Sequence, residues 1–326
     1  MRDSCGTLGV PLEEERFTMR TSVQFVSVWL AVTAALACSS GSSSTPKVCT
    51  YTANSTPTSA VSSEGCAELT FDVSSCLASR QALGLTGAWL RFSCRVTLTK
   101  TTKNGADYVV ITTDNHPQHK SSYYESTDAC YQADNADKSI NTSRGITASI
   151  TTATETMEVL LNPVGKDSSW TEVGKGTVGV AVDGVAILSP LAGPDSWSAF
   201  LAGGGDIWNE LNTLDRCKGH PTPSPDNLYH YHSEPPSVSR DDSNLIGVLA
   251  DGFFLYGRKD SGSSADLDTS AFSNDQPIGH VGVTADSAGQ SVFHYHPKQF
   301  SNSAKTSSFY SLTGRYFKGT ASSSRP

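Results

Sequence analysis

Charged residues are scarce in this sequence of 326 residues: they make up 17% of it, and the Lys and Arg residues form no cluster. Because recognition of a nucleic-acid backbone needs clustered Lys and Arg, the formal net charge of −8 argues against a nucleic-acid partner. No apolar run after residue 37 is long enough to span a bilayer. We therefore expect no transmembrane helix.

The motifs of several common enzyme classes are missing too. The sequence has no G-x-S-x-G turn for a serine nucleophile, no G-x-x-x-x-G-K-S/T phosphate loop and no dinucleotide fingerprint. The absence of C-x-x-C pairs argues against a thiolate zinc site or a thioredoxin-like redox site. Helical periodicity is rare, and its best example, residues 197–211, is broken by three glycines at 203–205.

The first informative segment is an apolar run over residues 23–37. It follows Met19-Arg20, ends in Ala35-Leu36-Ala37 and has the pattern of a signal peptide, with translation possibly starting at Met19. Cys38 and a Ser/Gly-rich tether at 38–47 come next and resemble a bacterial lipoprotein. We expect residues 1–37 to be removed and the protein to be exported, either lipidated on Cys38 in the cell envelope or secreted.

Six cysteines remain after Cys5 and Cys38 are set aside, an even number that indicates disulfides in an exported protein. Four of them lie within residues 48–104, so we expect a β-rich N-terminal segment held by disulfides there. Cys130 with Cys217 is a further possible pair. The candidates are Cys49, Cys66, Cys76, Cys94, Cys130 and Cys217. Residues 89–98, 108–112 and 149–161 are rich in strand formers, and we expect each to be extended.

Two stretches of the sequence share one order of parts. Each opens with an apolar run, 179–188 or 247–256, that is interrupted only by Asp-Gly. This pattern is typical of a two-residue hairpin with both turn residues at positive φ, so we interpret Asp183 and Asp251 as turn residues. Because the runs are apolar on both faces, we expect the hairpins to be buried between layers.

Each copy continues with Leu-Asp, Gly-His and a tetrapeptide in which aromatic residues alternate with histidines. Six of the eight histidines in the chain belong to this pattern. The parts are Leu214-Asp215, Gly219-His220 and Tyr229-His230-Tyr231-His232 in the first copy, and Leu267-Asp268, Gly279-His280 and Phe293-His294-Tyr295-His296 in the second. We predict an internal repeat at about 178–232 and 246–296.

These features predict an all-β or β-dominated fold. We expect two tandem homologous β-units with Asp-Gly hairpins, sandwich- or barrel-like in form, after the disulfide-bearing N-terminal segment. The units would face each other across a shared site, which would bring the two sets of histidines together.

The same residues resemble the YHYH domain family, whose name is the tetrapeptide at 229–232. The resemblance covers about residues 105–320. Further matches are C-x-G-H at 217–220, Asp-Gly-Phe at 251–253, Tyr-Gly at 256–257 and Pro-x-His at 117–119. The second copy departs from the pattern, since it has Phe293 at the first tetrapeptide position and no cysteine before its Gly-His. The resemblance implies a ligand role for His119 but no established reaction.

Alternation along a strand places the two histidines of each tetrapeptide on one face and the aromatic residues on the other. Adding the Gly-His histidine gives three imidazoles per copy, a ligand set that suits zinc or copper. The predicted metal ligands are His220, His230, His232, His280, His294 and His296, with His119 from the resemblance. Asp215 and Asp268 could orient an imidazole by accepting its second N–H.

Three functions remain open at this point. The first is an exported transition-metal-binding protein, with a metal ion or a small molecule as its partner. The second is a metal-dependent hydrolase that uses a metal-activated water. In the third, the histidines crosslink a metal-free structural or adhesive domain through hydrogen bonds to loop carbonyls or carboxylates.

Overall fold

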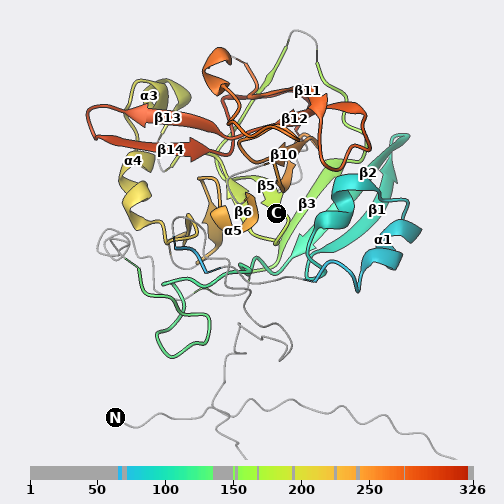
Figure 1. Ribbon diagram of the computed structural model, residues 1–326, viewed down its shortest axis with the longest axis horizontal. Coiled ribbons are helices and arrows are strands. Elements are labelled where there is room, and N and C mark those ends of the chain that lie inside the picture. Colours follow the sequence, from blue (N-terminus) through green and yellow to red (C-terminus); the bar gives the residue numbers. More distant parts are fainter. Residues whose placement is uncertain are drawn as a thin grey trace, which may run out of the picture. The chain divides into compact units, whose positions relative to one another are not determined.

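The fold is dominated by β-strands, as the sequence predicts, and has only short helices (Figure 1). The computed structural model describes residues 65–67, 72–134, 150, 153–166, 169–192, 195–223, 226–239, 243–274 and 276–321. The predicted leader and tether, Cys38 and Cys49 lie outside these residues. No helix among the described residues combines the length and the apolar character that crossing a membrane requires.

An eight-stranded sheet contains both copies of the repeat. Its strand order is β11-β12-β10-β9-β5-β6-β8-β7. The first copy supplies β5 (Thr177–Ala181), β6 (Ala186–Leu188), β7 (Gly219–Pro221) and β8 (Tyr229–Tyr231). The second supplies β9 (Leu245–Leu249), β10 (Phe254–Tyr256), β11 (Gly279–Val283) and β12 (Ser291–Tyr295). The central strands β5 and β9 are almost wholly buried, as their apolar sequences predict.

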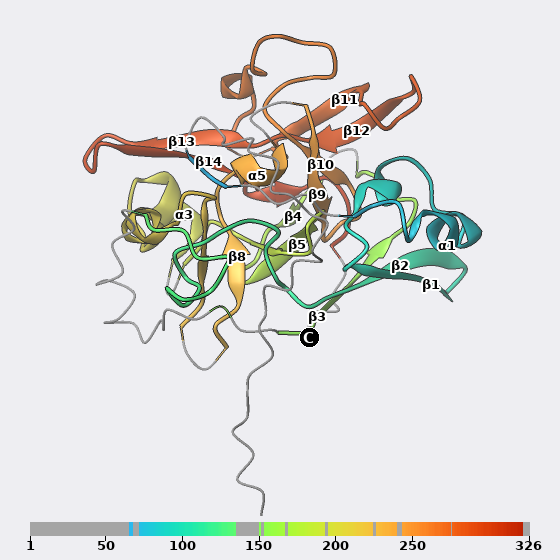
Figure 2. The ribbon, with the colours of Figure 1, turned by 60° about the horizontal axis from the view of Figure 1, so that its bottom comes forward.

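Equivalent strands occupy equivalent places in the two halves of this sheet. In each half the tetrapeptide strand, β8 or β12, runs parallel to the second hairpin strand and antiparallel to the Gly-His strand. The halves meet where β5 pairs with β9. The tetrapeptide strands therefore lie near opposite edges, five strand spacings or about 24 Å apart along the sheet. Figure 2 shows β8 well separated from β11 and β12.

The predicted shared site between the two histidine sets is thus wrong. The copies join through their apolar hairpin strands, whose burial on both faces places them at the centre of the sheet. The histidine-bearing strands are left at the periphery. The sandwich- or barrel-like form stays a prediction.

Both Asp-Gly hairpins have a three-residue loop, one residue longer than predicted. In the first, the Gly184 N–H donates to the Ala181 carbonyl (2.9 Å) and the Ala181 N–H donates to the Val185 carbonyl (2.8 Å). Of Asp183 and Gly184, only the glycine has a positive φ, at 95°. This is a tight turn followed by a left-handed glycine, a common three-residue hairpin. The second hairpin repeats it, with Gly252 at 88°.

A separate three-stranded sheet, β1 (Thr97–Lys103), β2 (Ala106–Thr113) and β3 (Glu155–Leu160), packs beside the large one. Strand β2 contains the extended segment predicted at 108–112, and β3 covers residues 155–160 of the one predicted at 149–161. The strand predicted at 89–98 is confirmed only at its last two residues, which open β1; it begins instead with the 3-10 helix η1 (Gly87–Arg91), which follows α1 (Leu77–Ala82). There the Trp89 ring packs edge-on against Phe254, 5.0 Å between centroids, so tertiary packing overrides the strand propensity.

Aromatic packing joins the helical segment to the C-terminal hairpin of β13 (Lys298–Asn302) and β14 (Ser307–Ser311). Helices α3 (Trp197–Leu201) and α4 (Ile207–Glu210) are separated at the three glycines, as predicted. Phe200 stacks on Trp208 at 5.6 Å, and both rings contact Phe309 edge-on. This packing fixes α4 beside β14. The remaining elements are η2 (Leu211–Thr213), α5 (Pro236–Ser239), η3 (Thr269–Ala271), and β4 (Thr171–Glu172) paired with β15 (Tyr316–Phe317).

The expectation of disulfide bonds is confirmed. Cys76 pairs with Cys94 inside the N-terminal segment, and Cys66 pairs with Cys217, 151 residues further along. The suggested Cys130–Cys217 pair is therefore wrong, although Cys130 is also disulfide-bonded. The Cys66–Cys217 bond ties the N-terminal segment to the turn that leads into β7.

Candidate functional site

Three histidines of each copy converge on one face of the sheet, as the alternation predicts. In the first copy His220 on β7 lies opposite His230 on β8; in the second, His280 on β11 lies opposite His294 on β12. We name His220, His230 and His232 the first histidine cluster, and His280, His294 and His296 the second histidine cluster. In each cluster one ring nitrogen per residue lies within 4.8 Å of the others.

Backbone and hydroxyl acceptors fix the ring orientation throughout the first histidine cluster. His230 Nδ1 donates to the Leu228 carbonyl (2.9 Å), and His232 Nδ1 donates to the Ser189 carbonyl (2.8 Å). A carbonyl can only accept, so both Nδ1 atoms carry the proton. The Thr213 hydroxyl donates to the Glu210 carbonyl and must therefore accept from His220 Nδ1, 2.7 Å away. Each of the three histidines thus presents Nε2.

The second histidine cluster repeats this arrangement. His294 Nδ1 donates to the carbonyl two residues before it (3.0 Å), as His230 does, and His296 Nδ1 donates to the Gly257 carbonyl (2.6 Å). Gly257 follows β10, just as Ser189 follows β6. The same backbone geometry therefore aims the imidazoles of both copies.

The Nε2 atoms come close together. His230 and His232 are 3.0 Å apart at Nε2, and His280 and His296 are 3.2 Å apart. Burial lowers the pKa of His230 and of His296 to about 4, and it lowers the pKa of His232 and His294 as well. At neutral pH His230 and His232 are therefore uncharged, and because Nδ1 carries the proton in both, their Nε2 lone pairs face one another. That contact is repulsive unless a cation lies between the nitrogens.

The donor set fits a tetrahedral metal. Zinc–nitrogen bonds of about 2.0–2.1 Å at tetrahedral angles imply nitrogens about 3.3 Å apart, close to the His230–His232 and His280–His296 separations. Donation of the remote ring N–H to a carbonyl is also the usual way in which proteins orient histidine ligands. Imidazole nitrogen suits zinc and copper alike.

A carboxylate completes the second histidine cluster. Asp260 Oδ1 lies 2.9 Å from His280 Nε2, 3.4 Å from His296 Nε2 and 3.8 Å from His294 Nε2. Near the first cluster, Glu210 Oε2 lies 3.7 Å from His232 Nε2. Sequence reasoning missed both carboxylates. Each stands between the hairpin and the Leu-Asp pair of its copy, but their distances from that pair differ, so no shared spacing marked them.

Glycine precedes the first histidine of each cluster for a steric reason. A Cβ on Gly219 would lie 2.3–2.5 Å from atoms of the Tyr229 phenol, and one on Gly279 would lie 2.8 Å from the Phe293 ring and 2.4 Å from the His294 carbonyl. The first aromatic residue of each tetrapeptide therefore packs over this glycine. Gly-His and the tetrapeptide form one packing unit.

The second aromatic residue of each tetrapeptide, a tyrosine in both copies, fixes its strand by a hydrogen bond on the opposite face. Tyr231 donates to Asp183 (2.8 Å), and Tyr295 donates to Asp251 (2.7 Å). Asp183 Oδ1 also accepts the Val185 N–H, and Asp251 Oδ1 accepts the Phe253 N–H. The aspartates thus have the predicted turn role and also anchor the tyrosines.

The remaining predicted site residues lie away from the clusters. His119 contacts the two tyrosine hydroxyls on the opposite face, with Nε2 3.0 Å from Tyr231 and 3.3 Å from Tyr229. Asp215 accepts from the Tyr229 hydroxyl (2.6 Å) and from the N–H groups of Cys217 (2.8 Å) and Gly219 (3.2 Å). Asp268 is exposed and caps η3 by accepting the Ser270 N–H. The structure therefore does not place either aspartate as an orienting partner of an imidazole.

His119 does have two sulfur neighbours, Cys66 and Cys217. Those two sulfurs are joined in a disulfide and are not available as thiolate ligands. His119 is buried, and its Nδ1 donates to the Lys120 carbonyl (2.9 Å). Through these contacts His119 links the segment between β2 and β3 to β8.

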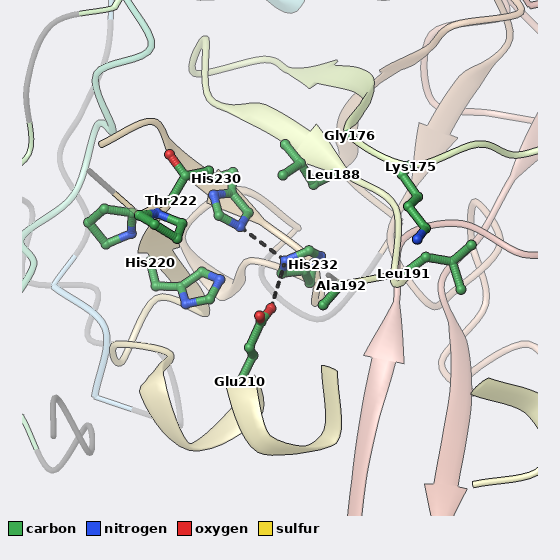
Figure 3. Close-up of a pocket in the computed structure, with 12 residues that line it drawn as sticks. Lys175, Gly176, Leu188, Leu191, Ala192, Glu210, His220, Thr222, His230 and His232 are labelled. Atoms are coloured by element: carbon green, nitrogen blue, oxygen red, sulfur yellow. Dashed lines mark hydrogen bonds and ion pairs between the residues drawn. The ribbon is translucent and has the colours of Figure 1, made fainter. Parts of the chain in front are cut away.

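A cavity of about 250 Å³ opens beside the first histidine cluster. All three histidines and Glu210 line it, together with a mainly apolar wall that includes Leu188, Leu191 and Ala192. Figure 3 shows His220 and His230 on one side of His232, with Lys175 and Leu191 on the other. The cluster is therefore reachable by a small molecule.

Comparisons with known proteins give one match. No curated protein and no solved structure matches the chain. Residues 156–281 match the family model described as YHYH protein. This range covers the first histidine cluster and extends to β11, where the second cluster begins, so the match confirms over these residues the resemblance that the motifs indicate.

Proposed function

We propose that this protein is an exported transition-metal-binding protein that holds zinc or copper at its two histidine clusters. The observation that carries the proposal is the convergence of three imidazoles in each copy: the Nδ1 atoms of the tetrapeptide histidines donate to carbonyls, and one pair of Nε2 atoms in each cluster lies only 3.0–3.2 Å apart. A bound cation would turn this repulsive contact into coordination. A proton shared between two rings is the alternative that fits a metal-free structural domain.

Thermal unfolding of the metal-free protein, purified without a His-tag and treated with chelator, separates these two functions. Zinc or copper at about 100 times its Kd should raise the free energy of unfolding by about 2.7 kcal/mol per site, and Tm by at least about 5 °C. A chain with His230, His232, His294 and His296 all replaced by Ala should show no rise.

His119→Gln is the matched control, because it removes a buried histidine outside both clusters. It should lower Tm but keep the response to metal. A wild-type protein whose Tm is unchanged by either metal would leave only the structural or adhesive function.

Hydrolysis by a metal-activated water is a second candidate, and the cavity beside the first histidine cluster favours it. Ester, phosphoester and peptide substrates tested with and without chelator would reveal such an activity. The activity should disappear in His230→Ala/His232→Ala and persist in His294→Ala/His296→Ala. Activity that survives the first double change would rule out the cavity as its site.

Export is proposed from the leader-like segment and from the disulfides, which persist in oxidising compartments. Intact mass spectrometry of the natural protein should give a chain that begins at or directly after Ala37. A lipid mass on Cys38 would place it at the cell envelope. Cytosolic protein that keeps residues 1–37 would contradict export.

A further inference from the structure

The two histidine clusters differ in their fourth group. In the second cluster one oxygen, Asp260 Oδ1, lies 2.9–3.8 Å from Nε2 of all three histidines. The first cluster, among the residues that the structure describes, has no carboxylate oxygen within 4.8 Å of all three ligand nitrogens. Glu210 Oε2 lies 3.7 Å from His232 Nε2.

The clusters also differ in what lies beside them. The cavity of about 250 Å³ borders the first cluster, and the Nε2 atoms of His230 and His232 meet at its wall (Figure 3). Leu188, Leu191 and Ala192 give the cavity an apolar side, while Lys175 and Glu210 supply one charge of each sign. Such a volume, with few polar groups, suits a small organic molecule.

Protein zinc sites fall into two classes that differ in the same property, the presence of a fourth protein ligand. Sites with four protein ligands are closed and structural, whereas sites with three protein ligands keep a position for water or an exogenous ligand. Three neutral imidazoles leave both charges of a divalent ion uncompensated by its ligands. Asp260 supplies a negative ligand in the second cluster, while the first cluster would have to obtain one from outside.

We propose that the first histidine cluster binds a small exogenous anion, of the class of short-chain carboxylates, at an open position of its metal, and that Asp260 closes the second cluster. This assignment rests on the proposed metal binding. It adds the class of the ligand and gives the two sites different roles, open at the first cluster and closed at the second. The anionic group binds the metal, and its short apolar body lies along the wall at Leu188, Leu191 and Ala192. Glu210 flanks the open position without filling it.

Cobalt(II) in place of the natural metal makes this testable, because its visible absorption responds to a change of ligand. Chelator-treated wild-type protein should take up two cobalt ions per chain. Azide, a small anionic probe, should then change the spectrum and saturate at one azide per two cobalt ions. Acetate should compete with azide. Failure to take up cobalt would refute the proposed metal binding itself, and two-ion uptake without any azide response would refute only the open position.

Variants show which histidine cluster gives the spectral response to azide. The azide response should be lost in His230→Ala/His232→Ala and retained in His294→Ala/His296→Ala, each with one cobalt ion. Adding Asp260→Ala to the first double variant should create a new response, because it opens the second cluster. Glu210→Gln should keep cobalt uptake and the azide response, and loss of the first-site cobalt in this variant would instead make Glu210 a ligand.

The wild-type stoichiometry keeps the proposal falsifiable even if a double variant does not fold. Saturation at two azides per two cobalt ions would show two open sites and overturn the assignment of Asp260. Ala192→Leu, which narrows the cavity, should weaken acetate binding at least about tenfold more than azide binding, a difference of about 1.4 kcal/mol. Equal weakening of both would contradict an apolar subsite.

Discussion

A single backbone hydrogen bond decides which nitrogen each tetrapeptide histidine offers. His230 and His294 donate Nδ1–H to the carbonyl two residues earlier, whereas His232 and His296 donate to the residue after the second hairpin strand. The first acceptor is local and follows from the strand itself. The second depends on the parallel pairing of β8 with β6 and of β12 with β10, so the pairing of distant strands sets the chemistry of the site.

Residue alternation predicted which side chains share a face, but it could not identify the carboxylates. Asp215 and Asp268 have equivalent places in the sequence and different environments: one is buried against Tyr229, and the other is exposed. Phe293, at the place of Tyr229, has no hydroxyl that could donate to an aspartate, whereas the Tyr229 hydroxyl donates to Asp215. Glu210 ends helix α4 and Asp260 lies in a loop, and neither belongs to a motif that the two copies share.

Replacement of Tyr229 by Phe tests this residue-scale account. The presence of Phe293 in the second copy predicts a mild effect, but the Tyr229 hydroxyl donates to the buried Asp215 at 2.6 Å. Because that bond involves a buried carboxyl group, we expect a loss of about 1.5–3 kcal/mol in the free energy of unfolding. Metal content should not change, because the hydroxyl lies on the face opposite the histidines. Urea unfolding beside Tyr108→Phe as a control checks this, and a loss below about 0.5 kcal/mol would contradict it.

At the scale of elements, the two copies share one packing unit, the Gly-His strand with the tetrapeptide strand. Different bonds hold that unit in place in each copy. Sequence repetition was sufficient to predict the hairpins, the glycines and the histidine strands, because each follows from local pattern. It could not predict that the Cys66–Cys217 disulfide supports only the first Gly-His strand. Cysteine positions alone do not define a pairing, and this bond joins residues 151 positions apart.

Removal of that disulfide should affect the two clusters unequally. Cys66→Ser/Cys217→Ser is expected to lower the free energy of unfolding by about 2–5 kcal/mol and to weaken metal binding at the first cluster, since Cys217 lies three residues before His220. Cys76→Ser/Cys94→Ser, which breaks a bond within the N-terminal segment, is the control and should leave the metal affinity of both clusters unchanged. Metal titration of each variant, followed by thermal unfolding, measures both effects. Equal affinities at the first cluster in the two variants would show that the disulfide does not position β7.

For the whole molecule, burial of neutral histidines makes stability depend on pH. Burial holds the pKa of His230 at about 4, below its ordinary 6.5, and lowers the pKa of His232 too. The unfolded chain then binds more protons than the folded chain below pH 6.5, so the stability present above that pH is lost as the pH falls toward 4. Burial raises the pKa of Asp251 from 3.8 to about 6, which opposes the loss between those values.

Chelator-treated protein should therefore lose stability between about pH 7 and pH 5. His230→Gln/His232→Gln should flatten that dependence by up to about 2.7 kcal/mol per pH unit, the effect of two protons at about 1.36 kcal/mol each. Urea unfolding at a series of pH values measures the slope. An unchanged slope would mean that these imidazoles are already protonated in the folded protein.

Global arrangement was the least predictable property of this chain. The repeat was evident, but a repeat can meet at its histidine strands or at its hairpin strands, and only the second arrangement buries the apolar runs 179–188 and 247–256 on both faces. This arrangement separates the clusters by about 24 Å along the sheet. It therefore predicts two independent metal sites instead of one shared site.

The claim of two independent metal sites is tested most directly by elemental analysis of metal content, on untagged wild-type protein and on the two double variants. After reconstitution with zinc or copper, the account predicts two ions per wild-type chain, one ion in His230→Ala/His232→Ala and one in His294→Ala/His296→Ala. A shared site would instead lose all of its metal in either variant. Wild-type protein that holds no metal after reconstitution would contradict the account as a whole and leave the histidines as crosslinks of the β-framework.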